Sequence, residues 1–251
     1  MVSHNKAPVV VVNNTKIKFS SVSVAHKYSE NYNSTCQWTN IESGTTTNPQ
    51  PVDYNTGTFT TGRSWWYIVM VTDGGEIYHT DPSNGRAFLD KTEKVVLDVG
   101  TGVISASSAV AGAFTVLRAL MHGGYGVPNA PGQGGPGALA PNTNTLTMHQ
   151  AVGGLIGIAI YTFTQLVANS ASTAGFKMFD LTSEDASAFS SSSAPAGNAV
   201  KININISDGG NGFEVVFTAP SGTASTPLYL QYRASSPPYS ISSEGKITGG
   251  V

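Results

Sequence analysis

The feature that most constrains this chain is a long stretch without acidic residues. Residues 99–179 contain no aspartate or glutamate, and Arg118 and Lys177 are their only lysine or arginine residues. A charged side chain loses favourable hydration when it is buried, so a stretch with very few charged residues can be buried away from water at low cost. We therefore expect residues 99–179 to lie in the protein's own core, between identical chains or in a lipid bilayer.

Two segments of this stretch hold most of its apolar side chains. Val103–Met121 places apolar residues at steps of three and four, which predicts an amphipathic helix. Ala151–Ala168 carries no charge and is mostly apolar, and its length lies at the lower end of the range for a transmembrane helix. Its isoleucines also alternate with smaller residues, so the pattern leaves both a helix and a strand open for this segment.

The residues before this stretch have the patterns of β-strands. Within residues 1–98, Lys16–Tyr28 alternates apolar and polar side chains, and the alternation changes phase at Ser20 and Ser21, which predicts a β-bulge. Ser64–Thr80 joins an aromatic and β-branched run to a second short run through a glycine turn, which predicts a hairpin. This part of the chain therefore favours an antiparallel sheet or sandwich.

The residues after the stretch are also rich in strand patterns. Within residues 180–251, Lys201–Ser207 alternates strictly and places its three isoleucines on one face. Phe213–Ala219 and Pro227–Ala234 have the composition of two more strands. Ser187–Gly197 is rich in serine and alanine, so we expect a linker there.

These patterns predict one compact domain over residues 1–251, of the α+β class. Its antiparallel sheet or sandwich would come from both chain ends, and one or two apolar helices from the middle would pack on it. Residues 1–98 and 180–251 would be β-rich, whereas residues 99–179 would be apolar, depleted of charge and partly helical.

Composition and charge narrow the function. The formal net charge is −2, the isoelectric point is about 6.2 and only 11% of residues are charged, against roughly 25% in ordinary soluble domains. We therefore expect no nucleic acid partner. The single cysteine, Cys36, excludes an internal disulfide, and no base is evident beside it, so we expect a packed thiol. The N-terminus lacks the pattern of a signal peptide, so we expect a cytoplasmic protein or export without a conventional signal, with membrane association.

The motifs that resemble catalytic sites are incomplete. Asp98, Gly100 and Gly102 match the opening of a methyltransferase cofactor loop, but the third glycine and the acid that binds the ribose are missing. Gly132–Gly137 matches a dinucleotide fingerprint, but no strand precedes it and a proline interrupts it. We therefore expect no enzyme activity, no catalytic residue and no cofactor.

The sequence also gives little support for a metal site. The histidines share no ligand spacing, although His79 and Asp81 lie close to the acidic residues Asp73 and Glu76 of the predicted hairpin turn. Acidic residues at exposed turns are usually solvated rather than metal-bound. We therefore expect no metal.

The aromatic residues are the best candidates for contacts with a partner. Trp65 and Trp66 are adjacent in a predicted strand, so they must point to opposite faces. Either one lies in the core and the other at the surface, or each is covered by one layer of a sandwich. An outward tryptophan suits a lipid interface, a sugar or another protein. The residues that we expect to contact a membrane or a partner are Trp38, Trp65, Trp66, Tyr67, Phe114, Leu117, Leu155, Ile156, Ile158 and Ile160.

The N-terminal part resembles small β-sandwich proteins that act on membranes, namely aegerolysins and actinoporin-like cytolysins. The resemblance lies in VVVVNNTKIKF, residues 9–19, and in GTFTTGRSWWYIVMVTDGGEIYHTDPSNG, residues 57–85. It covers about a third of the chain and implies a β-sandwich and lipid binding, with no functional residue carried over. The acid-free stretch departs from both families.

Together these features predict a non-enzymatic, membrane-acting protein, of the pore-forming or defence type. A β-rich part would recognise lipid or glycan, and the apolar segment would rearrange. We expect a lipid membrane or a glycan as partner, and a homo-oligomer. Two alternatives stay open, a self-assembling structural or storage protein and a lectin-like, glycan-binding module.

Overall fold

The fold is known from a computed structural model, which describes most of the two β-rich regions. The described residues are 2–29, 32–57, 62–81, 198–207, 210, 212–232, 240–241 and 247–248, together with 160–190 except 162, 163, 166, 170–172 and 174. The strands are β1 (Ser3–Asn13), β2 (Phe19–Tyr28), β3 (Tyr32–Ile41), β4 (Gln50–Thr56), β5 (Ser64–Thr72), β6 (Ile77–His79), β7 (Lys177–Met178), β8 (Val200–Ile206), β9 (Phe213–Ala219), β10 (Gly222–Tyr232), β11 (Ser240–Ile241) and β12 (Ile247–Thr248).

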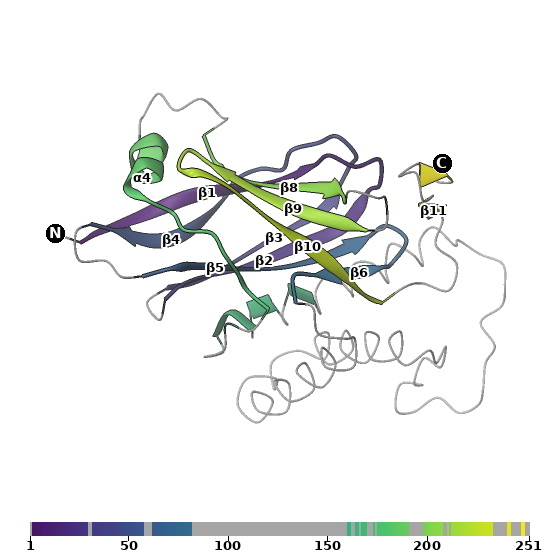
Figure 1. Ribbon diagram of the computed structural model, residues 1–251, viewed down its shortest axis with the longest axis horizontal. Helices are drawn as coiled ribbons and strands as arrows, with labels where there is room; N and C mark the ends of the chain where they lie inside the picture. The colour runs from purple at the N-terminus through teal and green to yellow at the C-terminus, as the bar shows by residue number, and fades with distance from the viewer. Residues whose placement is uncertain are drawn as a thin grey trace, which may run out of the picture.

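Ten of these strands form one sheet, in which strands from both ends of the chain are neighbours. Its order is β3-β2-β5-β6-β10-β9-β8-β1-β4, with β7 paired to the side of β5 (Figure 1). Neighbouring strands are antiparallel except for β1 and β8, which run parallel. β11 and β12 form a separate small sheet.

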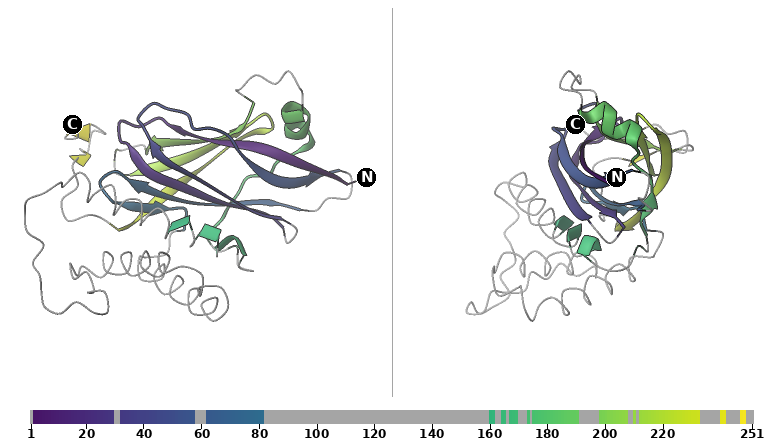
Figure 2. Two further views of the ribbon diagram at one scale, coloured as in Figure 1. Left: turned by 180° about the vertical axis from the view of Figure 1, so that it is seen from behind. Right: turned by 90° about the vertical axis from the view of Figure 1, so that its left-hand side faces the viewer.

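The predicted α+β class is wrong, because the described chain is nearly all β. Figure 2 (right) looks along the strands and shows them curving round a common interior, so that the sheet forms a nearly closed barrel. Among the described residues, helix is limited to α4 (Ser183–Ser190) and to a few helical residues between 160 and 169. A sheet that curves back on itself supplies both sides of its own core, so no layer of helices is needed to bury it.

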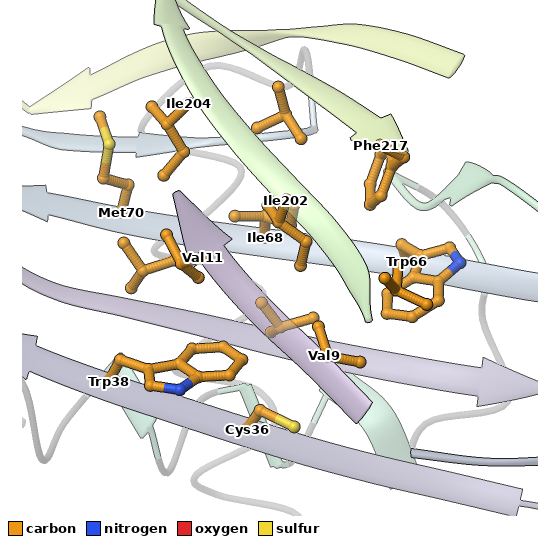
Figure 3. Packing of buried hydrophobic residues seen from close by; sticks show 14 of the residues in the cluster. Val9, Val11, Cys36, Trp38, Trp66, Ile68, Met70, Ile202, Ile204 and Phe217 are labelled. Atoms are coloured by element: carbon orange, nitrogen blue, oxygen red, sulfur yellow. The ribbon is translucent and has the colours of Figure 1, made fainter. Parts of the chain in front are cut away.

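Alternation along the strands fills the barrel with apolar side chains. In β9, buried residues alternate with half-exposed ones, as expected for a strand with one face on the core and one face outside. Side chains from several strands meet in the interior (Figure 3): Val9, Val11, Cys36, Trp38, Trp66, Ile68, Met70, Ile202, Ile204 and Phe217. The interior is therefore a packed core, and each large apolar side chain that it buries contributes roughly 1.5–3 kcal/mol.

Two local predictions from the sequence are confirmed. The pairing of β2 with β5 changes register between Phe19 and Ser21, so the expected bulge is present. The strands β5 and β6 pair as the expected hairpin. Its turn holds Gly75 at a φ of 82°, a left-handed conformation that glycine adopts without the strain imposed by a Cβ atom.

The strands β2 and β5 differ from β9 because they are buried on both faces. Val24 and Ile68 point into the barrel, so their neighbours Ala25 and Val69 must point outward. Both outward residues have no exposed surface. This side of the barrel is therefore covered from outside.

The described residues between 160 and 178 lie against this covered side. The hydroxyls of Tyr161 and of Thr35, on β3, are 3.4 Å apart. The ring of Phe176 is 5.4 Å from the ring of Tyr67, on β5, measured between centroids. The covered face is thus an interface between the sheet and the chain that leads into β7.

This contact accounts for part of one predicted apolar segment. The described end of Ala151–Ala168 is helical and buried, with Ile160 and Ala168 almost without exposed surface. The rest of that segment and the whole of Val103–Met121 lie outside the described residues.

The barrel closes through side chains where β3 meets β4, at the two ends of the strand order. The Nε2 group of Gln50 donates to the Gln37 carbonyl at 2.5 Å, and its Oε1 accepts from the Gln37 backbone N–H at 3.3 Å. The backbone N–H of Asp53 donates to Ser34 Oγ at 3.2 Å. These contacts replace a backbone ladder, and we call this line the β3–β4 seam.

A short connection, Phe179–Thr182, leads from β7 to α4, and we call it the strap. The indole N–H of Trp66 donates to the Phe179 carbonyl at 2.9 Å. The side chains of Phe179 and Leu181 belong to the core, and the Phe179 ring stacks on Phe217 with centroids 5.4 Å apart. The strap is therefore fastened to β5 and seals the core beside it.

The helix α4 begins with a capping box and lies at the rim of the barrel (Figure 2). The hydroxyl of Thr182 accepts from the Glu184 N–H at 3.2 Å, and Asp185 Oδ2 accepts from the Thr182 N–H at 2.7 Å. Asp185 Oδ1 also accepts from the Ser221 N–H, at 3.0 Å, in the turn before β10. The predicted linker Ser187–Gly197 is corrected here, because its first residues belong to α4.

Candidate functional site

The surface is hollowed at the end of the barrel where β1 begins. This hollow has a volume of about 440 Å³, and we call it the end hollow. Its lining comes from the ends of β2 and β4, the start of β5, and the strap with the first residue of α4. The lining residues are Tyr28, Asn55, Thr56, Gly57, Gly62, Arg63, Asp180, Leu181, Thr182 and Ser183. The barrel topology thus brings four distant segments together at a barrel mouth, a common place for ligand sites.

An ion pair in the lining joins β5 to the strap. Arg63 Nη1 donates to Asp180 Oδ2 at 2.6 Å, and the Ser64 N–H donates to Asp180 Oδ1 at 2.9 Å. The Arg63 side chain is 61% exposed and that of Asp180 is 28% exposed. The pair matches one positive charge with one negative charge at the mouth of the barrel and leaves guanidinium N–H groups within reach of solvent.

Two further polar groups of the lining have no hydrogen-bond partner within the described chain. The side-chain oxygen of Asn55 is buried and unpaired. The hydroxyl of Tyr28 makes no hydrogen bond with any described residue. An unpaired buried acceptor costs roughly 1–3 kcal/mol, so the Asn55 oxygen gains from a donor if a ligand or a water molecule reaches it from the hollow.

The hollow also depends on a close approach between Gly62 and Tyr28. A Cβ atom added at Gly62 would lie 2.4 Å from two carbons of the Tyr28 ring and 2.6 Å from its oxygen. No side chain fits at that distance. Gly62 therefore lets the chain before β5 lie directly on the ring, and it fixes one wall of the hollow.

An apolar patch lies near the hollow, two residues along the chain from each member of the Arg63–Asp180 ion pair. Trp65 pairs directly with Met178 across β5 and β7. Trp66 points into the core, so Trp65 points outward, as its place in the sequence predicts. Trp65 is half-buried and Met178 is 45% exposed. We call these two residues the Trp65–Met178 patch.

The residues predicted to contact a membrane or a partner differ in how far the structure buries them. Trp38, Trp66, Tyr67 and Ile160 are buried, and Trp65 is half-buried at the surface. The remaining five lie outside the described residues: Phe114, Leu117, Leu155, Ile156 and Ile158. Of the described candidates, Trp65 is therefore placed to meet a partner without a change of fold.

The interior holds titratable groups in neutral form. Both ring nitrogens of His26 are buried without a partner, and burial lowers the pKa of this imidazole to about 3. Burial raises the pKa of the Cys36 thiol to about 12, so at neutral pH this side chain packs as an uncharged thiol.

The described part of the chain offers no metal or membrane-spanning motif. Within it, no group of three or more histidine, cysteine, aspartate or glutamate side chains is placed to hold a metal ion. None of its helices has the length and apolar character needed to cross a bilayer.

Comparison with known proteins gives one similarity. The family model PUD1_2, described as "Up-Regulated in long-lived daf-2", matches residues 3–123, just under half of the chain. No curated protein matches the chain. The matched range contains β1 to β6, whereas the strap, α4 and the strands β8 to β10 lie beyond it. The description names a condition of expression and no activity.

The sequence patterns did not point to the residues of the end hollow. Tyr28, Asn55 and Arg63 lie in separate segments, and each is an ordinary residue for its position. Among the lining residues, Asp180 is the one that the sequence could have singled out, because it is the first acidic residue after the acid-free stretch. The return of an acidic residue at that point is consistent with a specific contact, and Asp180 makes one with Arg63.

Proposed function

We propose that this protein is a non-enzymatic binding protein that attaches to membrane surfaces through the hollowed end of its barrel. The observation that carries the proposal is the position of the Trp65–Met178 patch beside the end hollow. Indole rings favour the interface between lipid and water, where one side is apolar and the other is wet. The patch would enter the interface while the polar hollow meets the headgroups.

A second step follows from the acid-free stretch. We propose that part of residues 99–179 leaves the barrel and enters the bilayer after binding. The absence of acidic residues supports this step, because each charge at the centre of a bilayer costs roughly 2.5–3.5 kcal/mol on insertion scales. Insertion of the segment around Tyr161 would require its contact with Thr35 to break.

Vesicle flotation tests the docking step. The full chain is mixed with vesicles of neutral, anionic and sterol-containing lipids, and the bound fraction is measured for the wild type and for Trp65→Ala. Loss of the indole should weaken partitioning about tenfold. The matched control is Tyr229→Ala, since Tyr229 is 37% exposed on β10 and does not line the hollow. No binding to any vesicle, or equal weakening by both substitutions, would overturn the proposal.

Dye release from the same vesicles tests the insertion step separately. Leakage that requires Trp65 supports both steps. Binding without leakage removes the insertion step and leaves the docking step in place. Light scattering without lipid then tests the self-assembling alternative, which requires large particles in solution.

A further inference from the structure

We infer that the end hollow binds a neutral, hydroxyl-rich group of about the size of one sugar residue. This inference rests on the proposed function, because it names the chemistry that the hollowed end would recognise at a membrane surface. The same chemistry is carried by the headgroup of a glycolipid and by a soluble glycan, and the experiment below separates the two sources.

The matched charges of the lining select a neutral ligand. Asp180 already occupies one edge of the Arg63 guanidinium, at 2.6 Å. An anion such as phosphate would have to displace that carboxylate and would be repelled by it. A hydroxyl group has no net charge and can accept from the free guanidinium N–H groups while it donates to a carboxylate oxygen.

The unpaired groups of the lining match the same ligand. The buried oxygen of Asn55 needs a donor, and the Tyr28 hydroxyl can both donate and accept. A polyol presents several hydroxyls in a fixed arrangement, and each of them is a donor and an acceptor. One such ligand can therefore satisfy Asn55, Tyr28 and Arg63 together, which neither an apolar group nor a simple ion can do.

The hollow is large enough for this class of ligand. Its volume of about 440 Å³ lies within the range of roughly 300–1,000 Å³ that is usual for small-molecule sites. The adjacent Trp65–Met178 patch supplies an apolar surface for the lipid or for the ring that follows the bound residue. A headgroup in the hollow and an indole in the interface would then be held by one end of the barrel.

The experiment is a titration of the ¹⁵N-labelled full chain, followed by two-dimensional NMR. The soluble probes are the methyl glycosides of glucose, galactose, mannose and N-acetylglucosamine, a glycan array extends the range, and inorganic phosphate and phosphocholine are the charged probes. Vesicles with and without sugar-headed lipid form the second arm. The test variants are Asn55→Ala and Tyr28→Phe, and the control is Asn205→Ala, whose amide contacts Asn14 away from the hollow.

We expect at least one sugar to shift the resonances of the lining residues and Asn55→Ala to weaken its binding about tenfold, while Asn205→Ala leaves it unchanged. Binding only to vesicles with sugar-headed lipid, with the same dependence on Asn55, assigns the source to a lipid. No sugar binding in either arm, binding unaffected by both Asn55→Ala and Tyr28→Phe, or preference for phosphate or phosphocholine would overturn the inference.

The two proposals fail in different ways. If free sugars bind in the hollow and no vesicle of any composition is bound, the membrane function fails and the ligand assignment stands. If vesicles without sugar are bound through Trp65 and no sugar binds, the ligand assignment fails and the membrane function stands.

Discussion

The imidazole of His26 lies against the indole of Trp66 inside the barrel, with ring centroids 4.3 Å apart. The two residues are directly opposite each other on β2 and β5. Burial lowers the pKa of His26 to about 3, whereas the same group in an unfolded chain titrates near 6.5. The folded protein therefore holds this ring neutral at pH values where the unfolded chain would protonate it.

The stability of the protein should consequently fall with acid. Between about pH 6.5 and pH 3, His26 binds a proton in the unfolded chain and none in the folded one, so each unit of pH removes up to roughly 1.4 kcal/mol of unfolding free energy. Urea unfolding at pH 7, 6, 5 and 4 measures this slope. His26→Phe should flatten it, and His4→Phe, at an exposed histidine, should not. Equal slopes for the wild type and His26→Phe would contradict the assignment.

The contact between Gly62 and Tyr28 predicts a strong coupling between these positions. Gly62→Ala places a methyl group 2.4 Å from the tyrosine ring, and overpacking of this kind costs roughly 1–3 kcal/mol. In a Tyr28→Ala background the same change should cost little, since the ring that it strikes is gone. Chemical unfolding of the two single variants and the double variant gives the coupling energy. Additive effects would show that Gly62 is not required by the ring.

We expect the start of α4 to be stabilised mainly by one carboxylate, that of Asp185. It is fully buried and accepts from the backbone N–H groups of Thr182 and Ser221. Asp185→Ala leaves both donors unpaired and should destabilise the fold by roughly 2–4 kcal/mol. Glu184→Ala, one residue earlier on the exposed side, should change stability by less than about 0.5 kcal/mol. Thermal or urea unfolding compares the two, and similar losses would argue against the capping role.

We expect the β3–β4 seam to open locally when the side-chain amide of Gln50, which bridges it, is removed. Gln50→Ala takes away both hydrogen bonds to the Gln37 backbone. We expect faster hydrogen exchange at the Gln37 amide and a loss of roughly 1–2 kcal/mol of unfolding free energy. Asn205→Ala, on β8, serves as the control and should leave the Gln37 amide unchanged. Unaltered exchange in Gln50→Ala would mean that the seam is held by other contacts.

The strands whose alternation is strictest in the sequence are β8 and β9, which have one buried face. β8 and β9 alternate strictly, because Ile202 and Phe217 face the core while Asn203 and Val216 do not. The pattern of residues 16–28 also revealed its bulge. Burial on one side only produces the alternation of β8 and β9, so a single sequence is sufficient to find these two strands.

The fold class could not be predicted in the same way. β2 is polar on its outer face, with Ser21 and Ser23, yet both residues are buried. Periodicity shows which residues of a strand share a face and gives no information on what covers that face. Nor does any local pattern show that β1 pairs with β8 and β6 with β10, and these two pairings join the strands of both chain ends into one barrel. The end hollow was missed for the same reason, since it exists only after distant segments meet.

The parallel pairing of β1 with β8 has a consequence for how the chain is made. A ribosome releases β1 first, but its neighbour β8 follows only after the residues between Asn13 and Val200 have been translated. At about 5–20 residues per second, the early strands wait on the order of 10–40 seconds with open edges. Such edges pair readily with other polypeptides. We therefore expect a chain that is still being synthesised to need chaperones until β8 has left the ribosome.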